Sequence, residues 1–163
     1  MKRLNLITPP LCCVLLLFMA LVTIGNQVYA QENTRTNKML LERKNYSFLS
    51  APIGPYVHAV KYENTLYLSG VSAFDTKAQS AAIEIQTKEI FSQIQRIAES
   101  EGSGLENLVK ITAFVTELDR ISELRTMLFE IYGDNIPASS LIQVDGLFSD
   151  DLKIEIEAII ALP

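Results

Sequence analysis

Two carboxylates near the C-terminal end are the residues of this sequence most suited to chemistry. Glu155 and Glu157 lie two positions apart in a segment, 153–160, in which apolar and polar side chains alternate. Alternation with a period of two is typical of a half-buried strand, so both carboxylates share one face. A carboxylate in a cleft can act as a general acid or base, or orient a water molecule. The charged outer face of an ordinary strand explains the same pattern.

Polar side chains beside glycines form a second group of candidates. Tyr56 follows Gly54, and Ser69 directly precedes Gly70. Both hydroxyls can donate and accept hydrogen bonds, and a glycine lets the backbone approach a ligand closely. Turns also need glycine, so the pattern alone is weak. Arg125 adds a cation on the second expected helix, where it either reaches a cleft or faces solvent.

The sequence offers little with which to hold a metal ion or to build a catalytic triad. His58 is the only histidine, and we expect it to be a structural or solvent-facing strand residue. Both cysteines, Cys12 and Cys13, lie in the N-terminal apolar run. No G-x-S-x-G elbow, phosphate-binding loop or dinucleotide fingerprint occurs. We therefore expect no metal site.

The first 30 residues have the pattern of a signal peptide. Basic residues at positions 2 and 3 precede an apolar run, Leu11–Ile24, and Val28-Tyr29-Ala30 then offers small residues at the usual cleavage spacing. An uncleaved anchor is the alternative, but the run is short for a membrane span, which needs about 20 apolar residues. We expect cleavage after Ala30, no stable membrane anchor in the mature chain, and a periplasmic or secreted location.

The charge of the expected mature chain argues against nucleic acid as a partner. Cleavage would remove two of the 14 basic residues and none of the 19 acidic ones, which leaves a net charge of −7. Phosphate contacts supply most of the general affinity for nucleic acids, and the sequence contains no run of basic residues.

The remaining pattern predicts one α+β domain over residues 51–163, preceded by a flexible leader at 31–50. Expected strands cover 56–62, 65–69, 108–117, 140–144 and 153–160, with a two-residue turn at 63–64. Expected helices cover 81–101 and, from an N-cap at Asp119, about 120–132. The order β-β-α-β-α-β-β predicts a mixed sheet with both helices on one face. The last two strands read as a long-looped hairpin that closes this sheet.

The opposite face of the sheet should also be covered. The strand at 108–117 carries apolar residues on both sides, so we expect a second subunit to bury the face that the helices leave open.

Five short motifs, in order, resemble the reactive intermediate deaminase family, also called RidA or YjgF. They are Ile53-Gly54-Pro55-Tyr56, Leu68-Ser69-Gly70, Val109-Lys110-Ile111-Thr112, Pro137-Ala138 and Ile154-Glu155-Ile156-Glu157-Ala158. The resemblance extends from about residue 51 to 162. It implies a chorismate-mutase-like α+β fold and a homotrimer with ligand clefts between subunits. Active members of the family hydrolyse enamines and imines to 2-oxo acids and ammonia without a cofactor.

The resemblance also implies roles for individual residues. Tyr56 and Ser69 match positions that line the cleft, and Glu155 matches the glutamate that positions the attacking water. Active members read P-A-R-S where this chain reads Pro137-Ala138-Ser139-Ser140, so Ser139 replaces the arginine that binds the substrate carboxylate. Arg125 could supply a relocated cation.

Two functions follow as expectations. The first is an exported RidA-like protein that binds a small ligand, such as a carboxylate or an imine, in clefts between the subunits of a homotrimer. Its deaminase activity would be lost or altered, because Ser139 cannot hold a carboxylate by charge. The alternative is an active enamine/imine deaminase in which Arg125 or a neighbour replaces the missing arginine. Endoribonuclease activity, attributed to some relatives, is disfavoured by the charge and the export signal.

Overall fold

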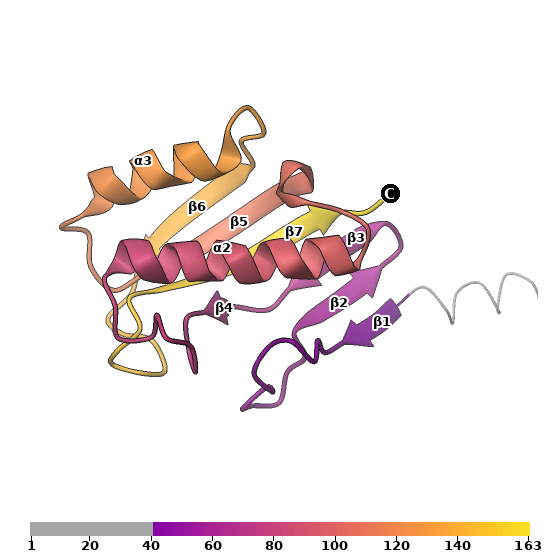
Figure 1. Cartoon of the computed structure of the whole chain (residues 1–163), viewed down its shortest axis with the longest axis horizontal. Helices are drawn as coiled ribbons and strands as arrows, with labels where there is room; N and C mark the ends of the chain where they lie inside the picture. Colours follow the sequence, from indigo (N-terminus) through magenta and orange to yellow (C-terminus); the bar gives the residue numbers. More distant parts are fainter. Residues whose placement is uncertain (1–40) are drawn as a thin grey trace, which may run out of the picture. The chain divides into compact units, whose positions relative to one another are not determined.

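The computed structural model describes residues 41–163, which fold as one α+β unit around a single mixed sheet (Figure 1). The strands are β1 (Leu41–Lys44), β2 (Ala59–Tyr62), β3 (Thr65–Leu68), β4 (Val71–Ser72), β5 (Leu108–Val115), β6 (Ala138–Gln143) and β7 (Ile154–Ala161). The helices are α2 (Ile83–Ser100), α3 (Ile121–Tyr132) and the short 3-10 helix η1 (Leu105–Asn107). The sheet order is β1-β2-β3-β7-β5-β6, and β4 also pairs with β7.

Both long helices lie on one face of the sheet, which confirms the predicted layout (Figure 1). The apolar stripe of α2 buries Ile90, Ile94 and Ile97 completely, in one cluster with the inward side chains of β5 and β7. An isoleucine side chain contributes about 1.5–3 kcal/mol when it is fully buried, so this stripe is the main anchor of the helix. Gly102, with a φ of +77°, then lets the chain leave the helix through a left-handed turn.

The predicted closing hairpin is wrong. Strand β6 pairs in parallel with β5, while β7 lies between β3 and β5 and is antiparallel to both. The crossover through α3 makes β5 and β6 parallel, because a helix returns the chain to the starting end of the sheet. The ten-residue connection at 144–153 then carries the chain past β5, so β6 becomes an edge strand with all six residues exposed.

The folded unit begins before residue 51. Residues 41–50, the second half of the predicted flexible leader, are part of it. Strand β1 pairs with β2, and Tyr46 is 9% exposed in the main core cluster. Lys44 holds this segment down through an ion pair of 2.7 Å with Glu101 at the end of α2. The sequence did not predict this strand of four residues, because a short edge strand needs little apolar surface and therefore shows no apolar periodicity. Residues 31–40 lie outside the described part of the chain.

The predicted N-cap of α3 is also displaced. The capping residue is Arg120 instead of Asp119, and it makes no side-chain capping hydrogen bond. Backbone bonds start the helix, with the Ile121 N–H donating to the Leu118 oxygen over 3.0 Å. The Arg120 guanidinium lies 2.7 Å from Glu84 of α2 and so connects the two helices.

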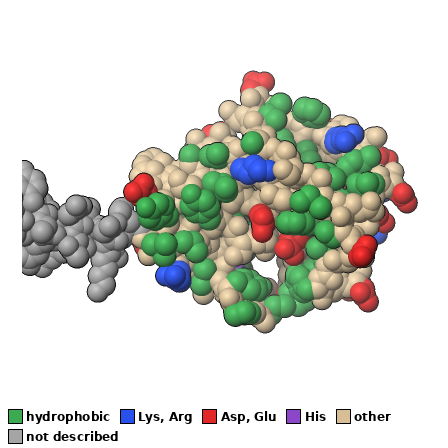
Figure 2. Space-filling view, turned by 180° about the vertical axis from the view of Figure 1, so that it is seen from behind, with side chains coloured by type: hydrophobic (Ala, Val, Ile, Leu, Met, Phe, Trp, Pro, Cys, Tyr) green, Lys and Arg blue, Asp and Glu red, His purple; other side chains and the backbone are tan. Residues whose placement is uncertain are grey.

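The sheet face opposite the helices is open in the single chain. It carries Tyr62, Tyr67 and Ile142, each 43–44% exposed, and the two carboxylates of β7. Figure 2, which views the molecule from behind, shows hydrophobic side chains in several patches over this face with acidic groups among them. Within residues 41–163, no helix is both apolar enough and long enough to cross a membrane. The predicted signal peptide lies outside these residues and stays a prediction.

Candidate functional site

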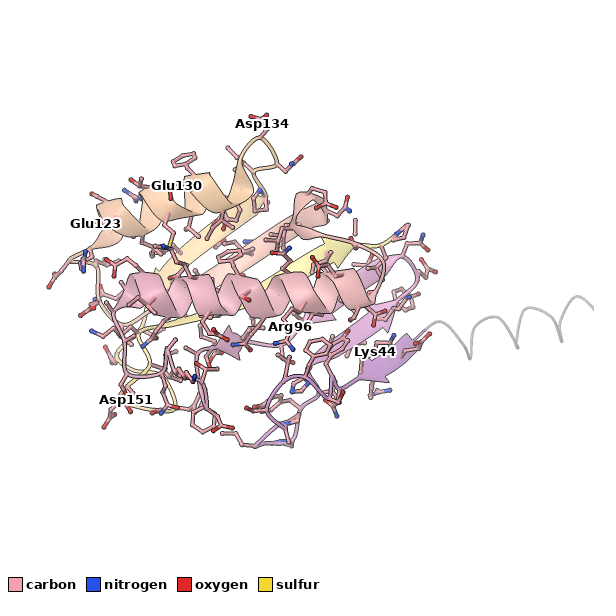
Figure 3. The ribbon with its side chains drawn as sticks, in the orientation of Figure 1. Lys44, Arg96, Glu123, Glu130, Asp134 and Asp151 are labelled. Carbon is pink, nitrogen blue, oxygen red and sulfur yellow. The ribbon has the colours of Figure 1, made fainter. Side chains whose placement is uncertain are left out.

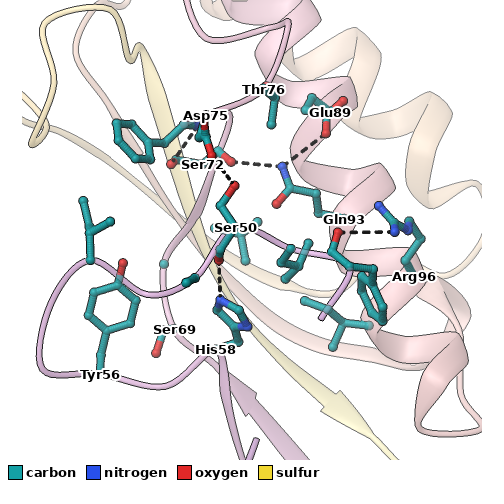
Figure 4. Close-up of a pocket in the computed structure, with 18 of the residues that line it drawn as sticks. Ser50, Tyr56, His58, Ser69, Ser72, Asp75, Thr76, Glu89, Gln93 and Arg96 are labelled. Carbon is teal, nitrogen blue, oxygen red and sulfur yellow. Dashed lines mark hydrogen bonds between the residues drawn. The ribbon is translucent and has the colours of Figure 1, made fainter. Parts of the chain in front are cut away.

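A cavity of about 380 Å³ lies between the segment 48–58, the segment 69–77 and helix α2 (Figure 4). Ligand-binding cavities commonly have volumes of about 300–1,000 Å³, so this one has room for a small metabolite. Tyr56, Ser69 and Gly70, three of the residues predicted from the sequence, line it. The structure therefore brings these three together in a hollow of the right size.

The hydroxyls of Tyr56 and Ser69 differ in how they are held. The Ser69 hydroxyl donates to the backbone oxygen of Val57 over 2.7 Å, which fixes its orientation and leaves its oxygen lone pairs as acceptors. The Tyr56 side chain is 45% exposed and lies beside Gly54. Because a Cβ at Gly54 would come within 3.0 Å of the tyrosine ring, the glycine makes space for this ring position. Tyr56 thus contributes a half-exposed ring to the wall of the cavity, and Ser69 contributes a hydroxyl of fixed orientation.

Position 70 must be a glycine because the Glu155 side chain occupies the space that a Cβ would fill. A Cβ at this position would lie 2.6 Å from the carboxyl carbon of Glu155 and closer still to one of its oxygens. The carboxylate therefore packs directly against the Gly70 backbone, next to the residues that line the cavity. Strand pairing fixes this arrangement, because Ser72 of β4 lies opposite Glu155 of β7. Glu155 does not line the cavity, and its side chain lies on the face of the sheet opposite the helices.

The environment of Glu155 favours its protonated form. Burial raises the pKa of the Glu155 carboxyl above its usual value, and the like charge of Glu157 raises it further. No hydrogen bond or ion pair to the Glu155 carboxylate occurs within residues 41–163. A carboxyl with a raised pKa and no internal partner is suited to exchange a proton or to orient a water molecule.

Two other predicted residues lie away from this cavity. Arg125 is exposed on α3 and does not line it. Ser139, on edge strand β6, pairs with Ile111 of β5, whose side chain faces the helices. Glu155 pairs with Phe114, on the opposite face of the sheet. Within one chain, therefore, the structure does not bring Ser139 and Glu155 together.

His58 has the structural role expected for it. Its Nδ1 accepts the Tyr46 backbone N–H over 3.0 Å, and its Nε2 lies 2.9 Å from the Ser50 backbone oxygen. The neutral ring with its proton on Nε2 satisfies both contacts. His58 thereby holds the segment 46–50, which forms one wall of the cavity.

The sequence analysis missed the polar residues that α2 contributes to the cavity. Glu89, Gln93 and Arg96 all line it. They recur at intervals of four and three positions, the spacing that places side chains on one face of a helix. This spacing beside the buried isoleucine stripe was the available signal. Within residues 41–163, no cluster of three or more histidine, cysteine or acidic side chains could hold a metal ion.

Comparison with known sequences identifies the family. The sequence profile described as Endoribonuclease L-PSP matches residues 48–162, which is most of the folded unit. The chain belongs to this family, which includes RidA and YjgF. A RutC family protein of Pyrococcus horikoshii is 32% identical over 111 residues, which cover 66% of this chain and 87% of the relative.

Other similar proteins include a named enzyme and a solved structure. A 2-iminobutanoate/2-iminopropanoate deaminase of Dermatophagoides farinae is 26% identical over 114 residues, 68% of this chain and 88% of the relative. The crystal structure of RidA from an Antarctic Psychrobacter species matches this fold with a TM-score of 0.67 and a sequence identity of 28%. The match covers 74% of this chain and 99% of the Psychrobacter chain. The fold of the RidA family is usually homotrimeric, and family members include imine and enamine deaminases.

Proposed function

We propose that this chain is an exported RidA-family protein whose homotrimer binds a small ligand in clefts between subunits, and that its deaminase activity is lost or altered. The observation that carries the proposal is Ser139, which stands where active relatives, by resemblance, carry the arginine that binds the substrate carboxylate. A serine hydroxyl offers a neutral hydrogen bond where an arginine offers a bidentate, charge-assisted one.

The position of Ser139 supports a cleft between subunits. The side chain is exposed on an edge strand and faces the helix side of the sheet, whereas Glu155 faces the open side. A ligand can contact both only if they come from different copies of the chain. The exposed aromatic and aliphatic side chains of the open face provide a surface for such a contact.

The retained half of the site supports ligand binding. Tyr56, Ser69 and Gly70 line a hollow, and the Glu155 carboxylate, whose pKa is raised, packs against the Gly70 backbone. The N-terminal pattern of basic residues, apolar run and small residues before Ala30 supports export. These features support the binding of a small molecule, and Ser139 is the residue that separates this proposal from the alternative, an active deaminase.

The test is ammonia release from 2-iminobutanoate by the chain from residue 31 to 163, measured beside Ser139→Arg. We expect wild type to release ammonia at close to the uncatalysed rate. A restored charge-assisted contact should raise the rate of Ser139→Arg by about 10–100-fold over wild type. Glu155→Gln in the Ser139→Arg background should abolish this gain, because the water-orienting carboxylate is then absent. Deamination by wild type at the rate of Ser139→Arg would contradict the proposal.

A further inference from the structure

The lining of the cavity includes charged groups that no family motif accounts for, two of them on α2. In Figure 4, Gln93 and Arg96 lie on the α2 side, with Tyr56 and Ser69 on the other side. Arg96 and Lys77 are the two cations that line the cavity, and Asp75 and Glu89 are the two anions. How each group is already bonded determines which of them can take a ligand.

Arg96 is held in place by an aromatic ring. Its guanidinium carbon lies 4.5 Å from the centroid of the Phe48 ring, and one of its nitrogens donates to the Phe48 backbone oxygen over 3.3 Å. Figure 3 shows Arg96 on the lower edge of α2, on the side of the helix from which this bond is made. Stacking on an aromatic face orients a planar guanidinium without consuming its other N–H donors. Arg96 forms no ion pair within residues 41–163.

The anions of the cavity, in contrast, have hydrogen-bond donors of their own. A Glu89 oxygen accepts the Gln93 side-chain amide over 3.3 Å, and an Asp75 oxygen accepts the Ser50 hydroxyl over 2.8 Å. The same Gln93 amide also donates to the Ser72 backbone oxygen over 3.1 Å. Within residues 41–163, the lining of the cavity therefore combines partnered anions with an oriented cation, Arg96, that forms no ion pair.

We propose that Arg96 binds the carboxylate of a small ligand at the α2 end of the cavity. The remaining N–H groups of a stacked guanidinium can hold a carboxylate through two parallel hydrogen bonds, and Lys77 adds positive charge to the same lining. The ligand class is thus a small carboxylate. This inference rests on the proposed function only for the presence of a small molecule in the cavity. It places the carboxylate anchor on α2 of the same chain and away from β6.

The experiment follows the Arg96 side chain directly by nuclear magnetic resonance. The chain from residue 31 to 163 is labelled with ¹⁵N, and the Nε–Hε signal of Arg96 is assigned by its loss in Arg96→Gln. Butyrate is the carboxylate probe, and sec-butylamine is the amine probe of similar size. We expect butyrate to shift the Arg96 signal in a saturable manner and sec-butylamine to leave it unchanged.

Two variants distinguish a direct contact of Arg96 with the ligand from a general effect of positive charge on α2. Arg96→Gln should weaken butyrate binding by about 10–100-fold, the effect of losing a charge-assisted contact. Lys88→Gln removes an exposed cation of α2 that does not line the cavity, and it should change the affinity by less than about twofold.

Two results would overturn the assignment of Arg96. One is butyrate binding that Arg96→Gln leaves unchanged, and the other is an Arg96 signal that butyrate does not move at all.

Tyr56→Ala distinguishes a wrong assignment of Arg96 from a failure of the proposed function. If Tyr56→Ala weakens butyrate binding and Arg96→Gln does not, the ligand cavity stands and the anchor is wrong. If only Arg96→Gln weakens it, the anchor stands and the role of Tyr56 is wrong.

Discussion

At the scale of single residues, Glu155 and Gly70 form the best-defined part of the site. The carboxylate packs on the glycine backbone, and only a residue without a Cβ leaves room for it. Burial and the charge of Glu157 both raise the pKa of the Glu155 carboxyl. Since a raised pKa means that the folded state binds the proton more tightly, ionised Glu155 costs stability at neutral pH.

The titration of Glu155 should report this environment. In wild type, we expect its carboxyl to titrate above pH 4.5, the ordinary value. Glu157→Gln should lower the pKa of Glu155, because it removes the like charge and leaves the burial unchanged. The stabilisation from the protonated carboxyl is present below pH 4.5 and is lost as the pH rises through the folded pKa. The measurement is the ¹³C shift of the Glu155 carboxyl against pH, and a midpoint at or below 4.5 would contradict the assignment.

At the scale of elements, the first strand is fastened to the end of α2 by one carboxylate. Glu101 accepts from Lys44 at 2.7 and 2.9 Å and from the Tyr46 hydroxyl at 3.2 Å, and Lys61 lies 3.6 Å away. Burial alone would raise the pKa of Glu101, but the hydrogen bond and charge of Lys44, the Tyr46 hydrogen bond and the charge of Lys61 together lower it. Strand β1 and the segment that walls the cavity therefore depend on this contact.

Glu101→Gln should destabilise the fold by about 1.5–3 kcal/mol at pH 7, the usual contribution of a hydrogen bond to a charged group. A lowered folded pKa gives stability that is present above the unfolded pKa and is lost as the pH falls through the folded pKa. The difference between wild type and Glu101→Gln should therefore narrow as the pH drops below about 4.5. Urea unfolding at fixed protein concentration measures it, with exposed Glu130→Gln as control. A difference that is constant from pH 7 to 3 would argue against the lowered pKa.

The sequence predicted elements with strong periodicity and missed those that depend on distant partners. The stripe of Ile90, Ile94 and Ile97 and the alternation of β7 determine local structure by themselves, so both elements were found. The polar β1 is a strand only because it pairs with β2 and its Lys44 forms an ion pair with Glu101. The parallel pairing of β6 likewise depends on the α3 crossover and not on its own residues.

The candidate site shows the same division. Tyr56, Ser69 and Gly70 were predicted from their neighbouring glycines and from motifs that resemble a family, and the structure gathers them around one cavity. Arg96 and Gln93 carry no motif, and only the packing of α2 brings them to that cavity. Arg125 was proposed as a substitute for the missing family arginine, and in the structure it is exposed and does not line the cavity.

At the scale of the whole molecule, the open sheet face provides the proposed contact between subunits. Tyr67 of β3 lies there opposite Ile159 of β7 and is 44% exposed. Exposed apolar patches of this kind mark interaction surfaces in soluble proteins. Burying a lysine in the centre of such a contact without a partner is costly.

Tyr67→Lys should therefore shift the proposed trimer towards monomer. Phe129→Lys is the matched control, because Phe129 is a 63% exposed aromatic residue on α3, on the helix side of the sheet. Sedimentation velocity over a range of protein concentrations measures the assembly state. A Tyr67→Lys protein that stays as fully associated as Phe129→Lys would exclude the open face from the interface.

The most direct test of the central claim compares three rates of ammonia release from 2-iminobutanoate. The rates of wild type, Ser139→Lys and Ser139→Arg are measured at equal protein concentration. The account predicts the order Ser139→Arg, then Ser139→Lys, then wild type, because arginine restores a bidentate contact and lysine a single charge. Equal rates for all three proteins, at a level well above the uncatalysed reaction, would contradict it, since the chain would then deaminate without any cation at position 139.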